Sequence, residues 1–200
     1  MGVDSGSELD GRNARRDRNR LSVLDTVLTL FREGNLRPRP EEVAERSGIS
    51  LRSVYRYYSD PSELLRSAIV RHLEAVVPLL HFHAIGQGTF EDRLEGFIDH
   101  RLRLYEAIAP TARASRLAAA DNDAIGDQYR RRQQTLRGQV EAQFAPELDA
   151  LPARRRRALT AAADALTQLE TLDYFRLDAG LSRRETREHL RLALGQILSP

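Results

Sequence analysis

The amino-acid sequence predicts an all-α protein with about nine helices. From residue 19 onward, apolar residues recur at spacings of three and four, which places them on one face of a helix. No segment alternates apolar and polar residues as a half-buried strand does, and no Asn-Gly or Asp-Gly pair joins two apolar runs. Glycines and prolines fall between the periodic segments, where helices commonly end. These three observations favour a helical architecture throughout.

The first periodic segment predicts a helix that begins near residue 19 and stops at Gly34-Asn35. Its apolar stripe consists of Leu21, Leu24, Val27, Leu28 and Phe31. Pro40 starts a second helix, because proline is tolerated at the first helical position and the next two residues are acidic. We expect that helix to end at Gly48.

Two further helices are predicted from their capping residues. Ser50 can cap a third helix with the sequence LRSVYRYY. Asp60, Pro61 and Glu63 match the N-cap, the first helical position and the capping-box position of a fourth helix. Pro78 should kink or end that helix.

Downstream of residue 88 the pattern predicts five more helices. Breaks are expected at Gly86–Gly88, at Pro110, at Asp121-Asn122, between Pro146 and Pro152, and at Gly180. The expected helices cover residues 89–108, 110–119, 122–145, 152–178 and 182–198.

Residues 1–18 are polar and have no periodicity, which predicts a disordered arm. Residues 11–20, GRNARRDRNR, carry five arginines against one aspartate. Such an arm can contact a DNA groove or backbone, or it can be a plain solvated tail.

Composition excludes several classes of protein. The chain contains no cysteine, which rules out disulfides, cysteine-ligated zinc and thiol catalysis. No run of eighteen apolar residues predicts a membrane-spanning helix, and the N-terminus lacks the apolar segment of a secretory signal. We therefore expect a cytoplasmic protein. All 31 Lys and Arg residues are arginine, whose planar guanidinium suits phosphates and guanine edges.

Residues 40–58, PEEVAERSGISLRSVYRYY, have the spacing of a helix-turn-helix. Ala44 is small where the two helices would touch, and Gly48 stands where the turn needs a left-handed residue. Val54 stands where the second helix would pack on the first, with Val43, Ile49 and Tyr58 completing a small core. With Val54 and Tyr58 inward, we expect the remaining polar side chains to face outward, namely Arg52, Ser53, Arg56 and Tyr57. The expected phosphate contacts are Tyr55, Tyr57 and amides near Ser50.

The segment LTLFREGNLRPRPEEVAERSGISLRSVYRYYSDPSELL resembles the DNA-binding domain of the TetR family of bacterial regulators. The matching motifs are Phe31 to Gly34, Val43-Ala44, Ser47-Gly48-Ile49-Ser50, Ser53 to Tyr58 and, in part, Ser62 to Leu65. The last segment, AGLSRRETREHLRLALGQIL, weakly resembles the family's final helix. This chain departs from the family in two places: Pro61 replaces the usual phosphate-binding lysine, and Arg39 replaces a frequent threonine.

The resemblance implies a transcription regulator, by default a repressor, that binds a palindromic operator in double-stranded DNA and is released by a small-molecule effector. The alternative is a ligand-binding helical dimer whose head has weak or no specific DNA binding, given Pro61. The expected organisation is an arm over 1–18, a helix-turn-helix domain over 19–66, and an effector-binding and dimerisation domain over 67–200. The expected DNA-contacting residues are Arg39, Ser50, Leu51, Arg52, Ser53, Tyr55, Arg56 and Tyr57.

Charged residues interrupt the apolar stripes of the C-terminal helices. Arg101 falls within the stripe of 89–108, and Arg132 within that of 122–145. Either arginine can pair with Glu170 or Asp173 across the core or extend to solvent. Alternatively, an arginine faces a cavity and binds a carboxylate of the effector. The candidate effector-binding residues are Phe97, Arg101, Tyr105, Tyr129 and Arg132.

The resemblance also implies a homodimer, for which the last two predicted helices are the candidate surface. The last helix has a stripe of Leu190, Ala193, Leu194, Ile197 and Leu198, and Ala161 to Ala163 of the helix before it permit close approach. Such a stripe can also be core, and the resemblance favours the dimer. Two-fold symmetry would place two recognition helices about 34–36 Å apart.

Nothing in the sequence indicates an enzyme. His81 and His83 are two residues apart, so on a helix they point to different sides, which disfavours binding of one metal by both. No nucleophile elbow, phosphate-binding glycine loop or His-Glu-x-x-His motif occurs. We expect no cofactor and no metal.

Overall fold

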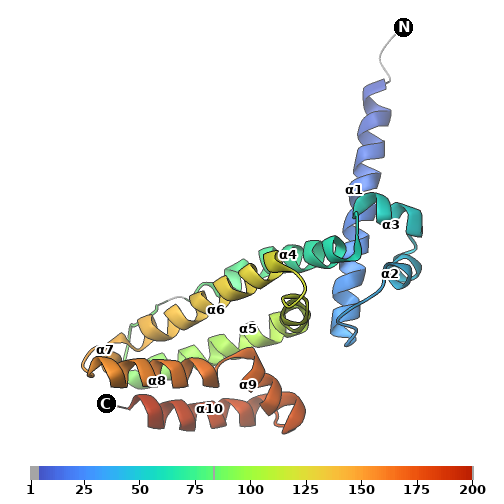
Figure 1. Cartoon of the computed structure of the whole chain (residues 1–200). Coiled ribbons are helices and arrows are strands. Elements are labelled where there is room, and N and C mark those ends of the chain that lie inside the picture. Colours follow the sequence, from blue (N-terminus) through green and yellow to red (C-terminus); the bar gives the residue numbers. More distant parts are fainter. Residues whose placement is uncertain (1–4, 83, 200) are drawn as a thin grey trace. The chain divides into compact units, whose positions relative to one another are not determined.

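The computed structural model describes residues 5–82 and 84–199, with the side chains of 5–10 and 12 left out. Over these residues it contains ten α-helices, one π-helix and no strand, which confirms the all-α prediction (Figure 1). In the described part, no helix is long and apolar enough to cross a membrane. The chain divides into two compact units. Unit 1 comprises the described residues up to Ala75 together with Pro110–Ile125, and unit 2 comprises Val76–Ala109 and the described residues from Gly126 onward.

Unit 1 is formed by the N-terminal helices. They are α1 (Ser5–Arg32), α2 (Pro40–Ser47), α3 (Leu51–Tyr57) and the first part of α4 (Pro61–Leu80), joined by the end of α5 (Phe90–Ala118). Figure 1 shows α2 and α3 packed beside α1. The core contains Phe31, Val43, Val54, Tyr58 and Leu64, each 1% exposed or less.

Unit 2 contains the rest of α4 and α5, most of α6 (Asp123–Gln143), and the C-terminal helices. These are α7 (Ala145–Leu148), α8 (Ala153–Leu166), α9 (Leu169–Asp173), a π-helix (Tyr174–Asp178) and α10 (Arg183–Leu198). α8 and α10 lie side by side (Figure 1). Phe97 of α5 and Phe144 pack edge to face in this core, with ring centroids 5.3 Å apart.

The predicted disordered arm is helical wherever the structure describes it, because α1 begins at Ser5. The part of the arm before Ser5 lies outside the described residues. The sequence contains no proline before Pro38, and Ala14, Arg15 and Arg16 are good helix formers. Extending an existing helix needs no new nucleus, so a polar segment next to a helix can continue it. Polarity alone was therefore not a sufficient reason to predict disorder here.

One predicted break is absent from the structure, and one predicted helix is divided by a break that was not predicted. Pro110 lies inside α5, which runs without interruption from Phe90 to Ala118, so the prediction of two separate helices was wrong. A proline within a helix costs about 3 kcal/mol. The flanking Ala109 and Ala112 are buried, at 5% and 0% exposure, and their burial favours keeping this segment helical. The single helix predicted over 152–178 instead divides into α8, α9 and the π-helix.

The compact units also differ from the predicted domains. Unit 1 extends past the predicted boundary at residue 66 to Ala75 and includes Pro110–Ile125. Ala114 and Ile125, which are 2% and 1% exposed, pack into the core of unit 1. Such a contact between distant segments leaves no local signal in the sequence.

Candidate nucleic-acid interface

The α2–α3 pair has the packing that its spacing predicts. Ala44 and Val54 are buried in the core of unit 1, at 8% and 1% exposure. Gly48 ends α2 with φ +69° and ψ 12°, in the left-handed region that favours glycine. Nothing lies within 4 Å of a Cβ built there, so the backbone conformation, and not space, requires the glycine.

The start of α3 is fixed by serine side chains. The Ser50 side chain accepts a hydrogen bond from the Ser53 backbone N–H at 3.3 Å, which confirms the predicted cap. The Ser50 hydroxyl contacts the Ser53 hydroxyl at 3.1 Å, and Arg56 donates to that same Ser53 oxygen at 3.1 Å. These contacts hold Arg56 along the surface of α3.

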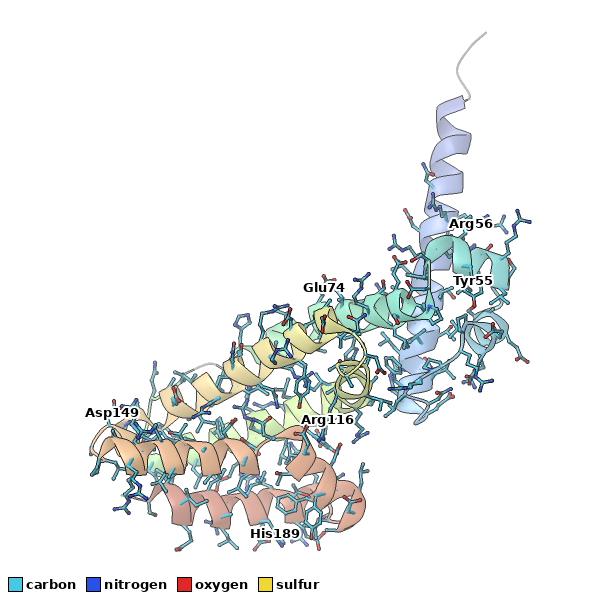
Figure 2. All side chains as sticks on the ribbon, in the orientation of Figure 1. Tyr55, Arg56, Glu74, Arg116, Asp149 and His189 are labelled. Atoms are coloured by element: carbon cyan, nitrogen blue, oxygen red, sulfur yellow. The ribbon has the colours of Figure 1, made fainter. Side chains whose placement is uncertain are left out.

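The exposed face of α3 consists of Arg52, Tyr55 and Arg56. Tyr55 is 43% exposed, and the two arginines are also exposed. Figure 2 labels Tyr55 and Arg56 on this helix. At about 100° per residue, these three residues lie within one third of the helix circumference. A face of this kind, rich in hydrogen-bond donors, suits a DNA groove.

Tyr57 does not face outward as the sequence analysis expected. It is 9% exposed and belongs to the core of unit 1, with the Arg56 guanidinium 5.3 Å from its ring centroid. The reason is helical periodicity: Tyr57 follows Val54 by three positions and therefore shares its inward face, as Tyr58 does at four. The outward face is consequently narrower than predicted, and Leu51 and Ser53 lie at its half-buried edge.

Several arginines in unit 1 are paired with carboxylates, including Arg46 with Glu33 at 2.5 Å, Arg71 with Asp25 at 3.1 Å, and Arg37 with Asp121 at 3.0 Å. Arg39, Arg52 and Arg56 are exposed and have no carboxylate within 4.0 Å among the described residues. The arginines without a carboxylate partner in this part of unit 1 thus lie on α3 and at the residue before α2.

Arg39 lies close to the start of α4. It precedes α2 as the N-cap residue, with φ −82° and ψ 148°, and its side chain makes no capping hydrogen bond. Arg39, Pro61 and Ser62 line one cleft of 280 Å³. The arginine therefore stands beside the position where the resemblance expects a lysine and this chain has Pro61.

The first turn of α4 is firmly capped. The Asp60 carboxylate accepts a hydrogen bond from the Glu63 N–H at 2.8 Å, as predicted for an N-cap. The Glu63 carboxylate accepts from the Ser59 N–H and hydroxyl, both at 2.6 Å. These hydrogen bonds hold the pKa values of Asp60 and Glu63 below their ordinary range, so both carboxylates are charged at neutral pH.

Unit 2 contains the predicted effector-binding arginine in an unusual setting. Arg101 is 2% exposed, and its guanidinium lies 4.5 Å from the centroid of the Phe97 ring. It donates to the Gln139 side-chain oxygen at 2.6 Å and to the Leu136 carbonyl at 2.7 Å. Its Nε has no acceptor among the described residues. Burial lowers the pKa of Arg101 to about 10, against the smaller opposing effect of Asp164.

The hydrogen-bond acceptors of Arg101 are thus neutral oxygens, and the pairing of Arg101 with Glu170 or Asp173 is not formed. Those two carboxylates instead accept hydrogen bonds from tyrosines. Tyr129 donates to Glu170 at 3.0 Å, and Tyr105 donates to Asp173 at 2.8 Å. Arg132 lies 4.9 Å from the Tyr129 ring centroid and is 9% exposed. The five predicted residues therefore lie in two groups: Phe97 with Arg101, and the remaining three around α9.

Sequence reasoning missed two polar groups in unit 2. Gln139 joins Arg101 to the end of α4, because its amide donates to the Leu80 carbonyl at 2.6 Å. Gln139 follows Arg132 by seven positions, so two helical turns place it on the same stripe, and this signal was available. The second group is a buried ion pair of Arg93 and Glu147, with side chains 6% and 9% exposed. Those residues are far apart in sequence, and no local pattern links them.

The comparison with solved structures finds a similar fold. The structure is similar to the crystal structure of a candidate transcriptional regulator from Streptomyces coelicolor A3(2), with a TM-score of 0.58 and 22% sequence identity. The similarity covers 92% of this chain and 99% of that one. No protein-family model matches the chain, and no curated protein matches its sequence significantly. The two proteins therefore share an all-α fold over nearly their whole lengths.

Proposed function

We propose that this protein is a DNA-binding transcription regulator that resembles the TetR family. The observation that carries the proposal is the outward face of α3, where Arg52, Tyr55 and Arg56 are exposed on a helix-turn-helix. The arginines on this face have no carboxylate partners in the described chain, although others in the same unit do. The likeness to the Streptomyces coelicolor protein supports the same class of function.

In this proposal α3 lies in the major groove of the operator. Arg52 and Arg56 can each donate two hydrogen bonds to the N7 and O6 atoms of guanine. Ser50, Leu51 and Ser53 lie at the N-terminal end of α3, which enters the groove in helix-turn-helix proteins. Tyr55 and Arg39 bind flanking phosphates, and Arg39 supplies there the charge that Pro61 lacks.

Effector control is proposed to act through the Arg101 cluster, which consists of Arg101, Phe97 and Gln139. A carboxylate-bearing effector would bind the guanidinium more strongly than the neutral Gln139 oxygen does. Gln139 also holds the Leu80 carbonyl at the end of α4, and α4 begins in the helix-turn-helix unit. An effector that displaces Gln139 would thereby favour another position of α4 and release DNA, as expected of a repressor.

A homodimer is proposed to bring two helix-turn-helix units to a palindromic operator. Leu190, Leu194 and Leu198 of the predicted dimer stripe are at most 2% exposed and pack in the core of unit 2 itself. Large apolar side chains of this region that are exposed include Tyr174, Leu177 and Leu192, at 56%, 61% and 56%. We assign the dimer contact to this C-terminal region.

The test of the DNA-binding proposal is a gel-shift titration with DNA flanking the protein's own gene, at two salt concentrations, with excess competitor DNA. We expect a discrete complex that survives the competitor and weakens as salt rises. Only diffuse binding that competitor removes would contradict specific recognition and favour the alternative of a ligand-binding dimer.

The effector proposal is tested separately by a thermal-shift screen of small aromatic and aliphatic carboxylates against the wild type and Arg101→Met. We expect at least one carboxylate to raise the melting temperature of the wild type and not that of the variant. Equal shifts in both proteins would contradict a role for Arg101.

A further inference from the structure

The first turns of α1 form an exposed, arginine-bearing helix. From Asn13 to Arg18 every side chain is exposed, and the first buried residue of the described α1 side chains is Val23. Figure 1 shows this part of α1 extending beyond the α2–α3 pair of the same unit. Packing in unit 1 therefore does not account for these arginines.

The arginines of this segment have no carboxylate partner in the part of the chain whose side chains are described. Arg15, Arg16 and Arg18 have no ion pair among the described residues, in contrast to Arg37, Arg46 and Arg71 of the same unit. Arg15 and Arg18 are three positions apart, a spacing at which like charges repel on a helix. A polyanion on this face would relieve that repulsion.

The three arginines also share one side of the helix. At about 100° per residue, Arg15, Arg16 and Arg18 lie within an arc of about 160°. Asp17, the only acidic residue between positions 11 and 20, falls outside this arc. The charge on that side is therefore uniformly positive.

Contacts of Arg20 with Tyr58 fix how far along α1 this segment lies from α3. The Tyr58 hydroxyl, directly after α3, donates to the Arg20 carbonyl at 3.2 Å, and the Arg20 guanidinium lies 5.5 Å from the Tyr58 ring centroid. With a rise of about 1.5 Å per residue, Arg15 to Arg18 lie about 3–8 Å further along α1. That distance is less than the width of the major groove, about 12 Å. At this axial distance, arginine side chains could reach phosphates beside the groove that α3 would occupy.

We propose that the first turns of α1 are a second DNA-binding element, in which Arg15, Arg16 and Arg18 contact phosphates outside the base pairs that α3 recognises. This inference rests on the proposed function for the placement of α3. The element binds without regard to sequence, so it adds affinity, salt dependence and footprint length to the complex.

The experiment measures binding to a promoter duplex and to a random duplex by fluorescence anisotropy at 50 and 200 mM salt. The test variant is R15A/R16A/R18A, whose alanines preserve the helix. R15K/R16K/R18K keeps the three charges, and R154A/R155A/R157A removes three exposed arginines of unit 2. Circular dichroism confirms that α1 is retained in each variant.

We expect R15A/R16A/R18A to lower the salt slope on both duplexes by about 2.7 per protomer, since each lost phosphate contact contributes about 0.9. Between the two salt concentrations, the wild type then loses about 40-fold more affinity per protomer than this variant. The lysine variant should match the wild type, and the unit 2 variant should keep the wild-type slope.

Equal slopes for the wild type and R15A/R16A/R18A on both duplexes would overturn this inference. If the wild type shows no preference for the promoter but the slope difference persists, the second element stands and the proposed specific recognition fails. If the unit 2 variant lowers the slope as much as the test variant, the effect is one of net charge, and the inference is overturned.

Discussion

Unit 1 exposes Arg39, Arg52 and Arg56, which have no carboxylate partner among the described residues, whereas unit 2 encloses Arg93, Arg101 and Arg132 at 6%, 2% and 9% exposure. The exposed arginines can donate most of their hydrogen bonds to a ligand outside the chain, since only Arg56 makes a side-chain hydrogen bond to a described residue, to the Ser53 hydroxyl. The buried ones use theirs within the fold, on Glu147, on neutral oxygens or over an aromatic ring. A single residue type thus provides the candidate DNA surface of one unit and the polar core of the other.

The largest expected effect comes from removing the exposed arginines of α3. R52A/R56A should lose about 2–6 kcal/mol of promoter binding, because each bidentate contact to a guanine contributes about 1–3 kcal/mol. Its melting temperature should not change, since both side chains are exposed. Anisotropy titration and calorimetry measure the two quantities. R154A/R155A serves as the control, and a comparable loss of specific binding in that control would contradict the assignment to α3.

The second effect concerns the buried Arg101 of unit 2 and its partner Gln139. Gln139→Leu removes the side-chain acceptor of Arg101 and the donor to the Leu80 carbonyl, and should lower the free energy of unfolding by about 1.5–3 kcal/mol. Chemical denaturation measures the change. The double variant Arg101→Met/Gln139→Leu should recover part of the loss, because the guanidinium is no longer buried without its acceptor. Simple additivity of the two single substitutions would contradict this coupling.

A third substitution tests the helix-turn-helix backbone itself. Gly48→Val forces a β-branched residue to φ +69° and should cost about 1–2 kcal/mol of stability. Gly48→Asn should cost less, because asparagine adopts the left-handed region more readily. Thermal unfolding of both variants gives the comparison, and equal destabilisation would contradict the requirement for a left-handed conformation at this position.

The smallest effect appears in the pH dependence of stability. Burial raises the pKa of the Tyr58 hydroxyl above its ordinary value, so the folded state favours the neutral form. The contribution of Tyr58 is therefore fully present below the pKa of the unfolded chain and is lost as pH rises through the higher folded pKa. Urea denaturation between pH 8 and pH 11 should show a steeper loss for the wild type than for Tyr58→Phe. Parallel curves would contradict a raised pKa.

The sequence predicted the elements whose signals are local. Gly48, Ser50 and Asp60 each perform the capping or turn role that their neighbours indicate. The inward position of Tyr57 was available from the same periodicity that placed Val54 inward, and was overlooked. Distant contacts were not predictable: Pro110 remains within α5 because residues on both sides are buried by other segments. The Arg101 cluster likewise depends on Gln139 of another helix.

The most direct test of the central claim is a hydroxyl-radical footprint of the wild-type protein on DNA flanking its own gene. If α3 of each protomer enters a major groove, protection should occur at two sites about one helical turn apart, 34–36 Å, or a multiple of that spacing. R52A/R56A should abolish both sites together. Uniform weak protection with no spacing, unchanged in that variant, would contradict the assignment of this protein as a sequence-specific DNA-binding regulator.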